Sequence, residues 1–131
     1  MQWTAAYLSN MPQGHAVIKL DFRNAFNSIR RDAMLEAAEK SVPDAYVFIH
    51  MAYATTSNLQ YGPEIIFSEE GVQQGDPLGP TLFCLTIHPL LVNCAAEVKI
   101  GYLDDITLGE KLVCLPQNSK HFGRGLKRWD W

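Results

Sequence analysis

The sequence predicts an α+β fold in which helices back an antiparallel sheet. Helical and strand patterns follow one another in the order α-β-α-α-β-β-α-β-β along 131 residues. The first strand has no partner close to it in the sequence, so it must pair with a distant strand, and tight turns join the later strands into hairpins. This mixture is typical of α+β domains. The chain has the length of one domain, and its 47% hydrophobic residues can supply a core.

Apolar periodicity and proline positions define the elements of the first half. Alternation places Val17, Lys19 and Asp21 on one face of a strand. Good helix formers follow, and Pro43 both stops one helix and opens the next. The predicted elements are, in order, a helix at 3–9, a strand at 16–22 and helices at 32–40 and 43–54.

The second half contains two hairpins separated by a long apolar helix. Gly62-Pro63 lies between two β-prone runs, which indicates a hairpin. Pro80 opens the helix, and Pro89 is expected to kink it. The predicted elements are strands at 59–61 and 65–68, a turn-rich loop at 71–79, a helix at 80–96 and a hairpin around Asp104-Asp105.

Periodicity is lost after Gly109. We therefore expect a domain over residues 1–109 and a divergent, poorly ordered tail over residues 110–131. Basic and aromatic residues lie together in this tail. Stacking on single-stranded nucleic acid is the alternative to a disordered end.

Charge and cysteine content restrict the function. A net charge of −3 gives no strong field for a polyanion, so a nucleic-acid partner would be held by other segments or by metal ions. Cys84, Cys94 and Cys114 lack the spacing of a zinc site, and the first two, ten residues apart on one predicted helix, cannot form a disulfide. We expect a reducing intracellular compartment, nucleus or cytoplasm, with no signal peptide and no membrane span.

Two adjacent aspartates, Asp104 and Asp105, lie in a predicted turn between β-prone runs. Neighbouring carboxylates repel each other, so each must stay solvated or bind a cation. With no lysine or arginine expected beside them, a divalent metal ion shared with a third ligand would relieve the repulsion. A solvated turn is the alternative.

Asp21 is the expected third ligand, because it ends the strand at 16–22 and would meet Asp104 if their strands are neighbours. Mg²⁺ prefers hard oxygen ligands and combines one or two carboxylates with phosphates. Two such ions about 3.5–4 Å apart can activate an attacking oxygen and stabilise a leaving one. Lys19 and Arg23 beside Asp21 would neutralise phosphate or simply form a solvated strand face.

The loop at 71–79 is the third candidate site element. Gly75 would allow the backbone to approach a base or sugar closely, and the Gln74 amide can donate and accept hydrogen bonds. The following helix offers free N–H groups to phosphate.

Three segments of the sequence resemble the motifs of reverse transcriptases. Residues 20–28, LDFRNAFNS, are similar to the first catalytic motif; residues 74–78, QGDPL, are similar to the second; and residues 102–105, YLDD, are similar to the third. The residues and the spacing of these motifs are most similar to those of the non-LTR retrotransposon branch. The resemblance covers residues 4–109 and implies a polymerase palm-like antiparallel sheet.

The resemblance also implies catalytic roles. Asp21, Asp104 and Asp105 correspond to the catalytic carboxylates and, with the backbone carbonyl of Phe22, to the ligands of two Mg²⁺ ions, for which Mn²⁺ could substitute. The implied reaction is in-line attack of a primer 3′-oxygen on the α-phosphate of a dNTP, with release of pyrophosphate. The implied partners are an RNA template, a DNA primer and the dNTP.

Further positions match substrate-binding residues of the family. Phe22 and Phe26 lie in the first motif, and Phe26 corresponds to the steric gate that excludes a ribose 2′-hydroxyl. Gln74 and Gly75 correspond to the loop that touches the incoming nucleotide and template. Tyr102 corresponds to the residue under the primer terminus. Without the resemblance, Phe26 and Tyr102 would be interpreted as packing residues.

The sequence departs from the family pattern in several places. Gly79 stands where many relatives have serine, and the fingers and thumb segments that flank a palm are not recognisable. We therefore expect the isolated chain to be inactive and to need such segments or a partner chain. The helix surface from Tyr46 to Tyr53 is expected to expose apolar residues, which predicts aggregation or a partner.

Two other functions are considered. The chain could be a non-catalytic retrotransposon remnant that keeps the palm fold as a binding or interaction module. It could also be another two-metal enzyme, such as a nucleotide cyclase, but the loop at 74–77 disfavours this interpretation.

Overall fold

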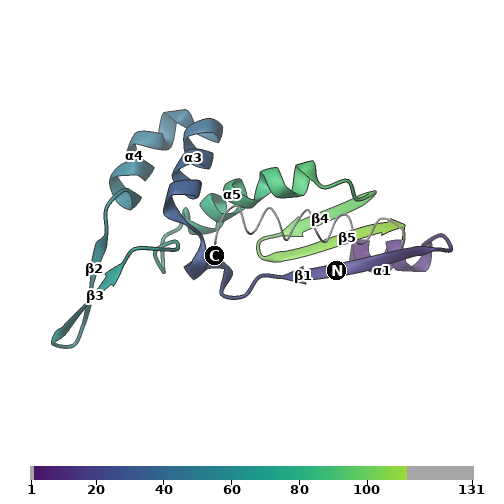
Figure 1. The fold of residues 1–131 in the computed structure, drawn as a ribbon, viewed down its shortest axis with the longest axis horizontal. Helices are drawn as coiled ribbons and strands as arrows, with labels where there is room; N and C mark the ends of the chain where they lie inside the picture. Colours follow the sequence, from purple (N-terminus) through teal and green to yellow (C-terminus); the bar gives the residue numbers. More distant parts are fainter. Residues whose placement is uncertain (1, 112–131) are drawn as a thin grey trace. The chain divides into compact units, whose positions relative to one another are not determined.

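The structure is a computed structural model that describes residues 2–111, and the predicted tail beyond Lys111 lies outside the described residues. The described residues divide into two compact units, one formed by 2–23 and 90–111 and the other by 24–89. Figure 1 shows the elements in chain order. They are α1 (Gln2–Ser9), β1 (His15–Asp21), α2 (Ala25–Ser28), α3 (Arg31–Ser41), α4 (Pro43–Tyr53), β2 (Ser57–Tyr61), β3 (Glu64–Ser68), α5 (Gly79–Asn93), β4 (Val98–Tyr102) and β5 (Asp105–Lys111).

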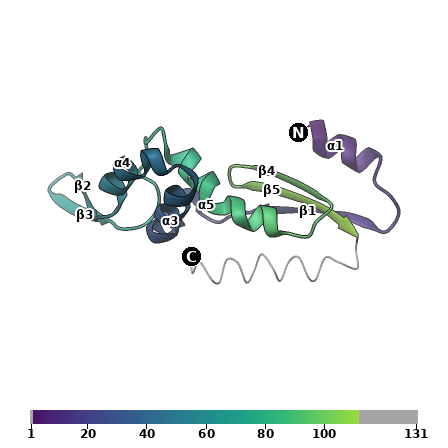
Figure 2. The same ribbon diagram turned by 90° about the horizontal axis from the view of Figure 1, so that it is seen from above.

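The first unit is built on a three-stranded antiparallel sheet in the order β1-β5-β4 (Figure 2). The first strand of the chain thus pairs with the last described one, as the predicted non-local pairing requires. The α+β prediction is confirmed by this sheet and its helices. Strand β5 continues through Lys111, past the boundary expected at Gly109.

The two faces of this sheet are covered differently. A Cβ on Gly109 would lie 2.5 Å from the Tyr7 ring of α1, whereas a Cβ on Gly101 would lie 2.8 Å from Leu91 near the end of α5. Side chains alternate along strands, so Gly109 and Gly101 belong to opposite faces. The α5 face carries Ile106 and Leu108, which are buried. The face that contacts α1 is polar at one end of the sheet, where Asp21 and Asp105 lie.

The second unit has its own hydrophobic core. Helices α3 and α4 and the start of α5 supply buried side chains, and the cluster consists of Met34, Ala38, Ile49, Tyr53 and Leu82. Pro43 stands in the first turn of α4, as predicted, because a proline there sacrifices no intrahelical hydrogen bond. Strands β2 and β3 form a separate antiparallel ribbon, with Tyr61 opposite Glu64 around the predicted Gly62-Pro63 turn.

The predicted end of the long apolar helix is wrong. Helix α5 ends at Asn93 instead of continuing to Ala96, and Lys99 donates hydrogen bonds to the carbonyls of Val92 and Cys94, both at 3.1 Å. A cation at this end also complements the helix dipole. Cys94 therefore lies beyond the helix that carries Cys84. The short helix α2 was not predicted.

A helix that spans a membrane must be both long and apolar, and none of the helices within residues 2–111 meets both requirements.

Candidate active site

The predicted carboxylates of the first unit gather at one end of its sheet. Asp21, the last residue of β1, lies directly opposite Asp105, the first residue of β5. Directly opposed residues of an antiparallel pair have Cβ atoms about 4.5–5.5 Å apart and project to the same face. Asp104 precedes Asp105 in the turn between β4 and β5. Strands β1 and β5 are therefore neighbours, which is the condition under which Asp21 was expected to meet Asp104.

The turn that carries Asp104 has an unusual backbone. Tyr102 pairs with Asp105, which leaves Leu103 and Asp104 as the two turn residues. Leu103 has a φ of 55°, in the left-handed region that is costly for a residue with a branched side chain. A positive φ at the first turn residue matches the twist that two-residue hairpins need, for which glycine is the usual choice. The strained backbone of Leu103 thus places Asp104 at the tip of the β4–β5 hairpin.

A lysine lies beside Asp105, contrary to the expectation that no lysine or arginine would lie beside Asp104 and Asp105. Lys19 is on the same face of β1 as Asp21, and its Nζ lies 3.0 Å from Oδ1 of Asp105. Both side chains are largely exposed, so the ion pair contributes little to folding. It does partly offset the repulsion between Asp105 and the opposed Asp21. Lys19 therefore forms an exposed ion pair with Asp105, a contact that was not among the alternatives considered for it.

The donor atoms at this edge suit a hard cation that keeps other ligands. Asp21 and Asp104 offer carboxylate oxygens, and Mg²⁺ is usually held by one or two carboxylates together with substrate phosphates. Within residues 2–111, no three His, Cys, Asp or Glu side chains gather closely enough to hold a metal ion by themselves. Asp21, Asp104 and Asp105 therefore do not form a three-ligand metal cluster among the described residues.

Aromatic residues flank the carboxylates in the first unit. Tyr102 pairs with Asp105 and is 75% exposed, so its ring is available to a ligand. Phe22 follows Asp21 and is half-buried. A pocket of about 640 Å³ opens on the same sheet face, and its lining residues are Ala5, Leu8, Lys19, Ile100, Tyr102, Asp105 and Thr107.

The remaining predicted site residues belong to the second unit. Gln74 is exposed, and Gly75 has a φ of 88°, a conformation for which glycine is favoured. A Cβ at Gly75 would meet no atom within 4 Å, so the loop surface there is open. Phe26 packs its ring on Phe83, with centroids 4.7 Å apart. The structure thus gives Phe26 a packing contact in addition to the gate role that the resemblance implies.

Hydrogen bonds hold the residues on both sides of Gln74 and Gly75. The Gln73 amide donates to Ser57 Oγ at 2.9 Å and to the Ala52 carbonyl at 3.4 Å. The backbone N–H of Gln73 donates to the Tyr53 hydroxyl at 3.2 Å, and that hydroxyl donates to the Asp76 carboxylate. Gln73 is therefore a structural residue of the loop.

Asp76 also starts the segment that leads into α5. Its Oδ1 accepts the N–H of Leu78 at 2.8 Å, the pattern of an aspartate turn. Burial, assisted by the hydrogen bond to Asp76, raises the pKa of Tyr53 to about 12. The Tyr53 hydroxyl therefore remains a donor at all physiological pH values.

A buried arginine, Arg31, makes hydrogen bonds to the residues that precede and begin the loop at 71–79. Arg31 is 7% exposed, and its guanidinium donates to the carbonyls of Ser68 at 2.8 Å and Gly71 at 3.1 Å and to the Ser68 hydroxyl at 2.8 Å. Longer contacts of 3.5 Å reach the carbonyls of Thr55 and Glu70. Burial lowers the pKa of Arg31 from its ordinary value. The carbonyl groups that accept these hydrogen bonds compensate the buried charge of Arg31 for its lost hydration.

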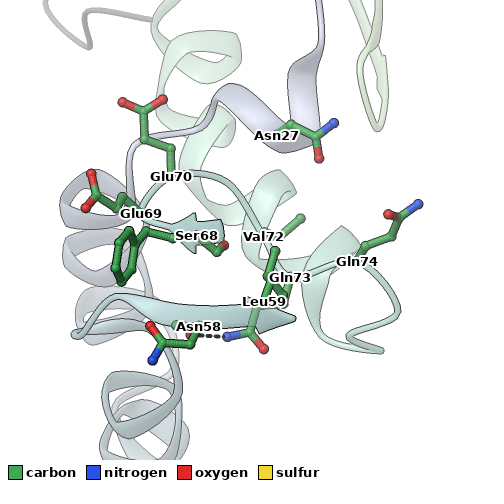
Figure 3. Close-up of a pocket in the computed structure, with 11 residues that line it drawn as sticks. Asn27, Asn58, Leu59, Ser68, Glu69, Glu70, Val72, Gln73 and Gln74 are labelled. Carbon is green, nitrogen blue, oxygen red and sulfur yellow. Dashed lines mark hydrogen bonds between the residues drawn. The ribbon is translucent and has the colours of Figure 1, made fainter. Parts of the chain in front are cut away.

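A second pocket, of about 810 Å³, lies between the base of the β2–β3 ribbon and the Gln73-Gln74 segment (Figure 3). Figure 3 shows the Gln73 amide directed to the start of β2, whereas the Gln74 side chain extends away from that strand. The lining is rich in amides and hydroxyls and includes Glu69 and Glu70. Neither lysine nor arginine is among the residues that line this pocket.

The structure places the predicted site residues in two groups. Asp21, Phe22, Tyr102, Asp104 and Asp105 belong to the unit with the three-stranded sheet, and Phe26, Gln74 and Gly75 belong to the other. Sequence reasoning did not identify Arg31, Tyr53 and Asp76. Only Asp76 had a local signal, because an aspartate just before a helical segment commonly accepts a backbone N–H there, and Asp76 lies three residues before Gly79.

Comparisons with known proteins agree with the motifs. A family model for reverse transcriptase (RNA-dependent DNA polymerase) matches residues 1–116. Two retrovirus-related Pol polyproteins from the type-1 retrotransposable element R2 of Popillia japonica are similar to the chain. The first is 31% identical over 119 residues, covering 72% of the chain and 18% of the relative. The second is 30% identical over 105 residues, covering 74% and 14% respectively.

The chain thus spans less than a fifth of the length of these curated relatives. The family match covers most of the chain and includes all three motif segments. Their order and the pairing of Asp21 with Asp105 are consistent with that match. The chain therefore belongs to the reverse transcriptase family, and within it to the non-LTR retrotransposon type.

Proposed function

We propose that this chain is the nucleotidyl-transfer region of an RNA-directed DNA polymerase and that it acts as part of a longer polypeptide. The observation that carries the proposal is the register that sets Asp21 opposite Asp105, with Asp104 in the adjoining turn. The substrates would be an RNA template, a DNA primer and a dNTP. The reaction joins the primer 3′-oxygen to the α-phosphorus and releases pyrophosphate.

The carboxylates of Asp21 and Asp104, with the backbone carbonyl of Phe22, would hold two Mg²⁺ or Mn²⁺ ions in this proposal. When bound, such ions activate the attacking oxygen and stabilise the leaving one. Asp105, assigned the same role by its motif, is engaged by Lys19 at 3.0 Å. We therefore assign Asp105 a lesser share of the binding than Asp21 and Asp104.

The other site residues would bind and select the substrate. The Phe26 ring, held against Phe83, would exclude a ribose 2′-hydroxyl and so favour deoxynucleotides. Gln74 and Gly75 would contact the incoming nucleotide and template through the open loop surface. The exposed Tyr102 ring would support the primer end.

A graft tests the proposal. Residues 1–116 would replace the matching region of the Popillia japonica R2 polyprotein, and primer extension on an RNA template would be measured with Mg²⁺. We expect extension by the graft and none by the isolated chain. Asp21→Asn and Asp104→Asn should each reduce extension by a factor of at least about 100, since each removes a ligand charge at the reacting centre.

The matched control is Asp44→Asn, at an exposed position in the first turn of α4, which should extend as the unsubstituted graft does. Retained activity in Asp104→Asn would refute the metal assignment. A correctly folded but inactive graft would favour the alternative, a non-catalytic module. The apolar side chains that α4 exposes are the observation that favours this second candidate.

A further inference from the structure

We propose that Tyr53 is a positioning residue for the Gln74–Gly75 loop and that Arg31 fixes Tyr53 in place. The inference deepens the proposed function, because it concerns how the loop is prepared for the incoming nucleotide. It assigns a role to two residues outside the three motif segments. Both lie in the second unit, together with the loop.

The first step is the hydrogen bonding of the Tyr53 hydroxyl. It accepts the backbone N–H of Gln73 at 3.2 Å and donates to the Asp76 carboxylate. Gln73 and Asp76 are the residues immediately before and after the Gln74–Gly75 pair. One buried hydroxyl therefore connects both ends of a two-residue segment whose own surface is open.

The second step is the closure of the loop by its own backbone. The N–H of Asp76 donates to the Gln73 carbonyl at 3.1 Å, so the four residues form a tight turn. Gly75 supplies the positive φ that this turn needs. The Tyr53 hydroxyl thus lies against a turn that is already closed and fixes its orientation.

The third step is the packing of Tyr53 itself. The side chain is 2% exposed within the core cluster, and the Arg31 guanidinium lies 5.4 Å from its ring centroid. A cation at this distance from an aromatic face is attracted to it. Arg31 is in turn held by the carbonyls of Ser68 and Gly71, so the ring packs against a side chain that is itself fixed.

Together these contacts make a continuous support from Arg31 through Tyr53 to the loop. Binding loops held in their productive geometry before the ligand arrives lose less entropy on binding. Removal of the hydroxyl should therefore weaken nucleotide binding and leave the chemical step intact. A purely structural role would instead lower stability without this selectivity.

The first test uses the chain itself and the variant Tyr53→Phe, with Tyr61→Phe on the exposed β2 strand as matched control. Amide hydrogen exchange would be measured residue by residue together with thermal unfolding. We expect the Gln73 amide to exchange about tenfold faster in Tyr53→Phe, the factor that corresponds to about 1.4 kcal/mol. The control should match the wild type, and the midpoint of unfolding should change little because the ring remains.

The second test uses the graft in the R2 polyprotein. Tyr53→Phe should raise the KM for dNTP about five- to tenfold and leave kcat within twofold, the signature of lost binding common to ground and transition states. Arg31→Lys keeps the charge but loses the planar fork, and it should raise KM in the same direction. Tyr61→Phe should change neither parameter.

Three outcomes would overturn the inference. They are equal exchange of Gln73 in Tyr53→Phe and wild type, faster exchange with an unchanged KM, and a loss of protection spread evenly over α3 and α4. An unsubstituted graft without activity would instead refute the proposed function, and the exchange comparison would still decide whether Tyr53 orders the loop.

Discussion

Leu103 shows how one residue's backbone shapes the turn between β4 and β5. Its φ of 55° is unfavourable for a leucine, by about 1–2 kcal/mol for a left-handed residue with a Cβ. Strain of this kind persists where the surrounding structure enforces it and is often found at functional sites. Here the enforcing structure is the β4–β5 pairing, which fixes Tyr102 opposite Asp105.

Replacement of Leu103 by glycine should therefore stabilise the chain by about 1 kcal/mol, because glycine adopts positive φ without a steric penalty. Urea unfolding at pH 7 measures the change. Leu59→Gly, in the exposed strand β2, is the matched control and should destabilise, since glycine weakens a strand. A loss of stability in Leu103→Gly equal to that of the control would show that the turn depends on the leucine side chain.

Asp32 illustrates how a single ion pair makes stability depend on pH. Arg30 donates to its carboxylate, with Nε 3.0 Å from Oδ1, and this lowers the pKa of Asp32 below its ordinary value of 3.8. The folded state thus favours the ionised form. The stabilisation is complete above the ordinary pKa and is lost as the pH falls through the lowered value.

We expect Asp32→Asn to unfold at a lower urea concentration than the wild type at pH 6, by a small margin because the pair is exposed. The margin should shrink as the pH is lowered below 3.8 and should also shrink in 1 M salt at pH 6. A margin that is independent of both pH and salt would assign the effect to helix capping and not to charge.

At the scale of the element, helix α4 exposes an apolar stripe on one side and buries another. Val47, Phe48 and Met51 are 69%, 67% and 77% exposed, whereas Ile49 and Tyr53 lie in the core cluster. The exposure expected for the surface from Tyr46 to Tyr53 is thus found on one side of this helix. Contiguous exposed apolar side chains favour association.

Phe48→Glu should therefore reduce self-association of the chain without lowering its stability. Sedimentation velocity at increasing concentration measures the first property and urea unfolding the second. Ile49→Glu is the opposite control, because a charge in the core should unfold the unit. Unchanged association in Phe48→Glu would show that another surface, such as the β2–β3 ribbon, is responsible.

Prediction at this scale succeeded where the signal was local. Gly62-Pro63 identified one hairpin, and Asp104 in the second turn lies where the β-prone runs around it required. Helix α2 was missed because four residues show no periodicity, and it begins after Asn24, whose φ is 54°. The contacts of Arg31 could not be foreseen, because the arginine and Gly71 are 40 residues apart.

At the scale of the whole molecule, the described residues are strongly acidic. Residues 1–111 contain seven Lys and Arg residues against thirteen Asp and Glu residues, a net charge of −6. A protein that holds nucleic acid through its own surface neutralises phosphates with basic side chains and releases counterions. The described residues have few such side chains to offer.

This charge balance predicts weak binding of a primer–template duplex by the isolated chain. Fluorescence anisotropy with an RNA–DNA duplex should give a dissociation constant no tighter than about 10⁻⁵ M in 0.15 M salt, the range of non-specific binding. The slope of log K against log salt should be shallow, since it scales with the number of phosphates neutralised. Mg²⁺ should strengthen binding in the wild type but not in a variant with both Asp21→Asn and Asp104→Asn. A steep salt slope retained after deletion of residues 112–131 would instead reveal a basic surface on the described fold and would require a different account of how the nucleic acid is held.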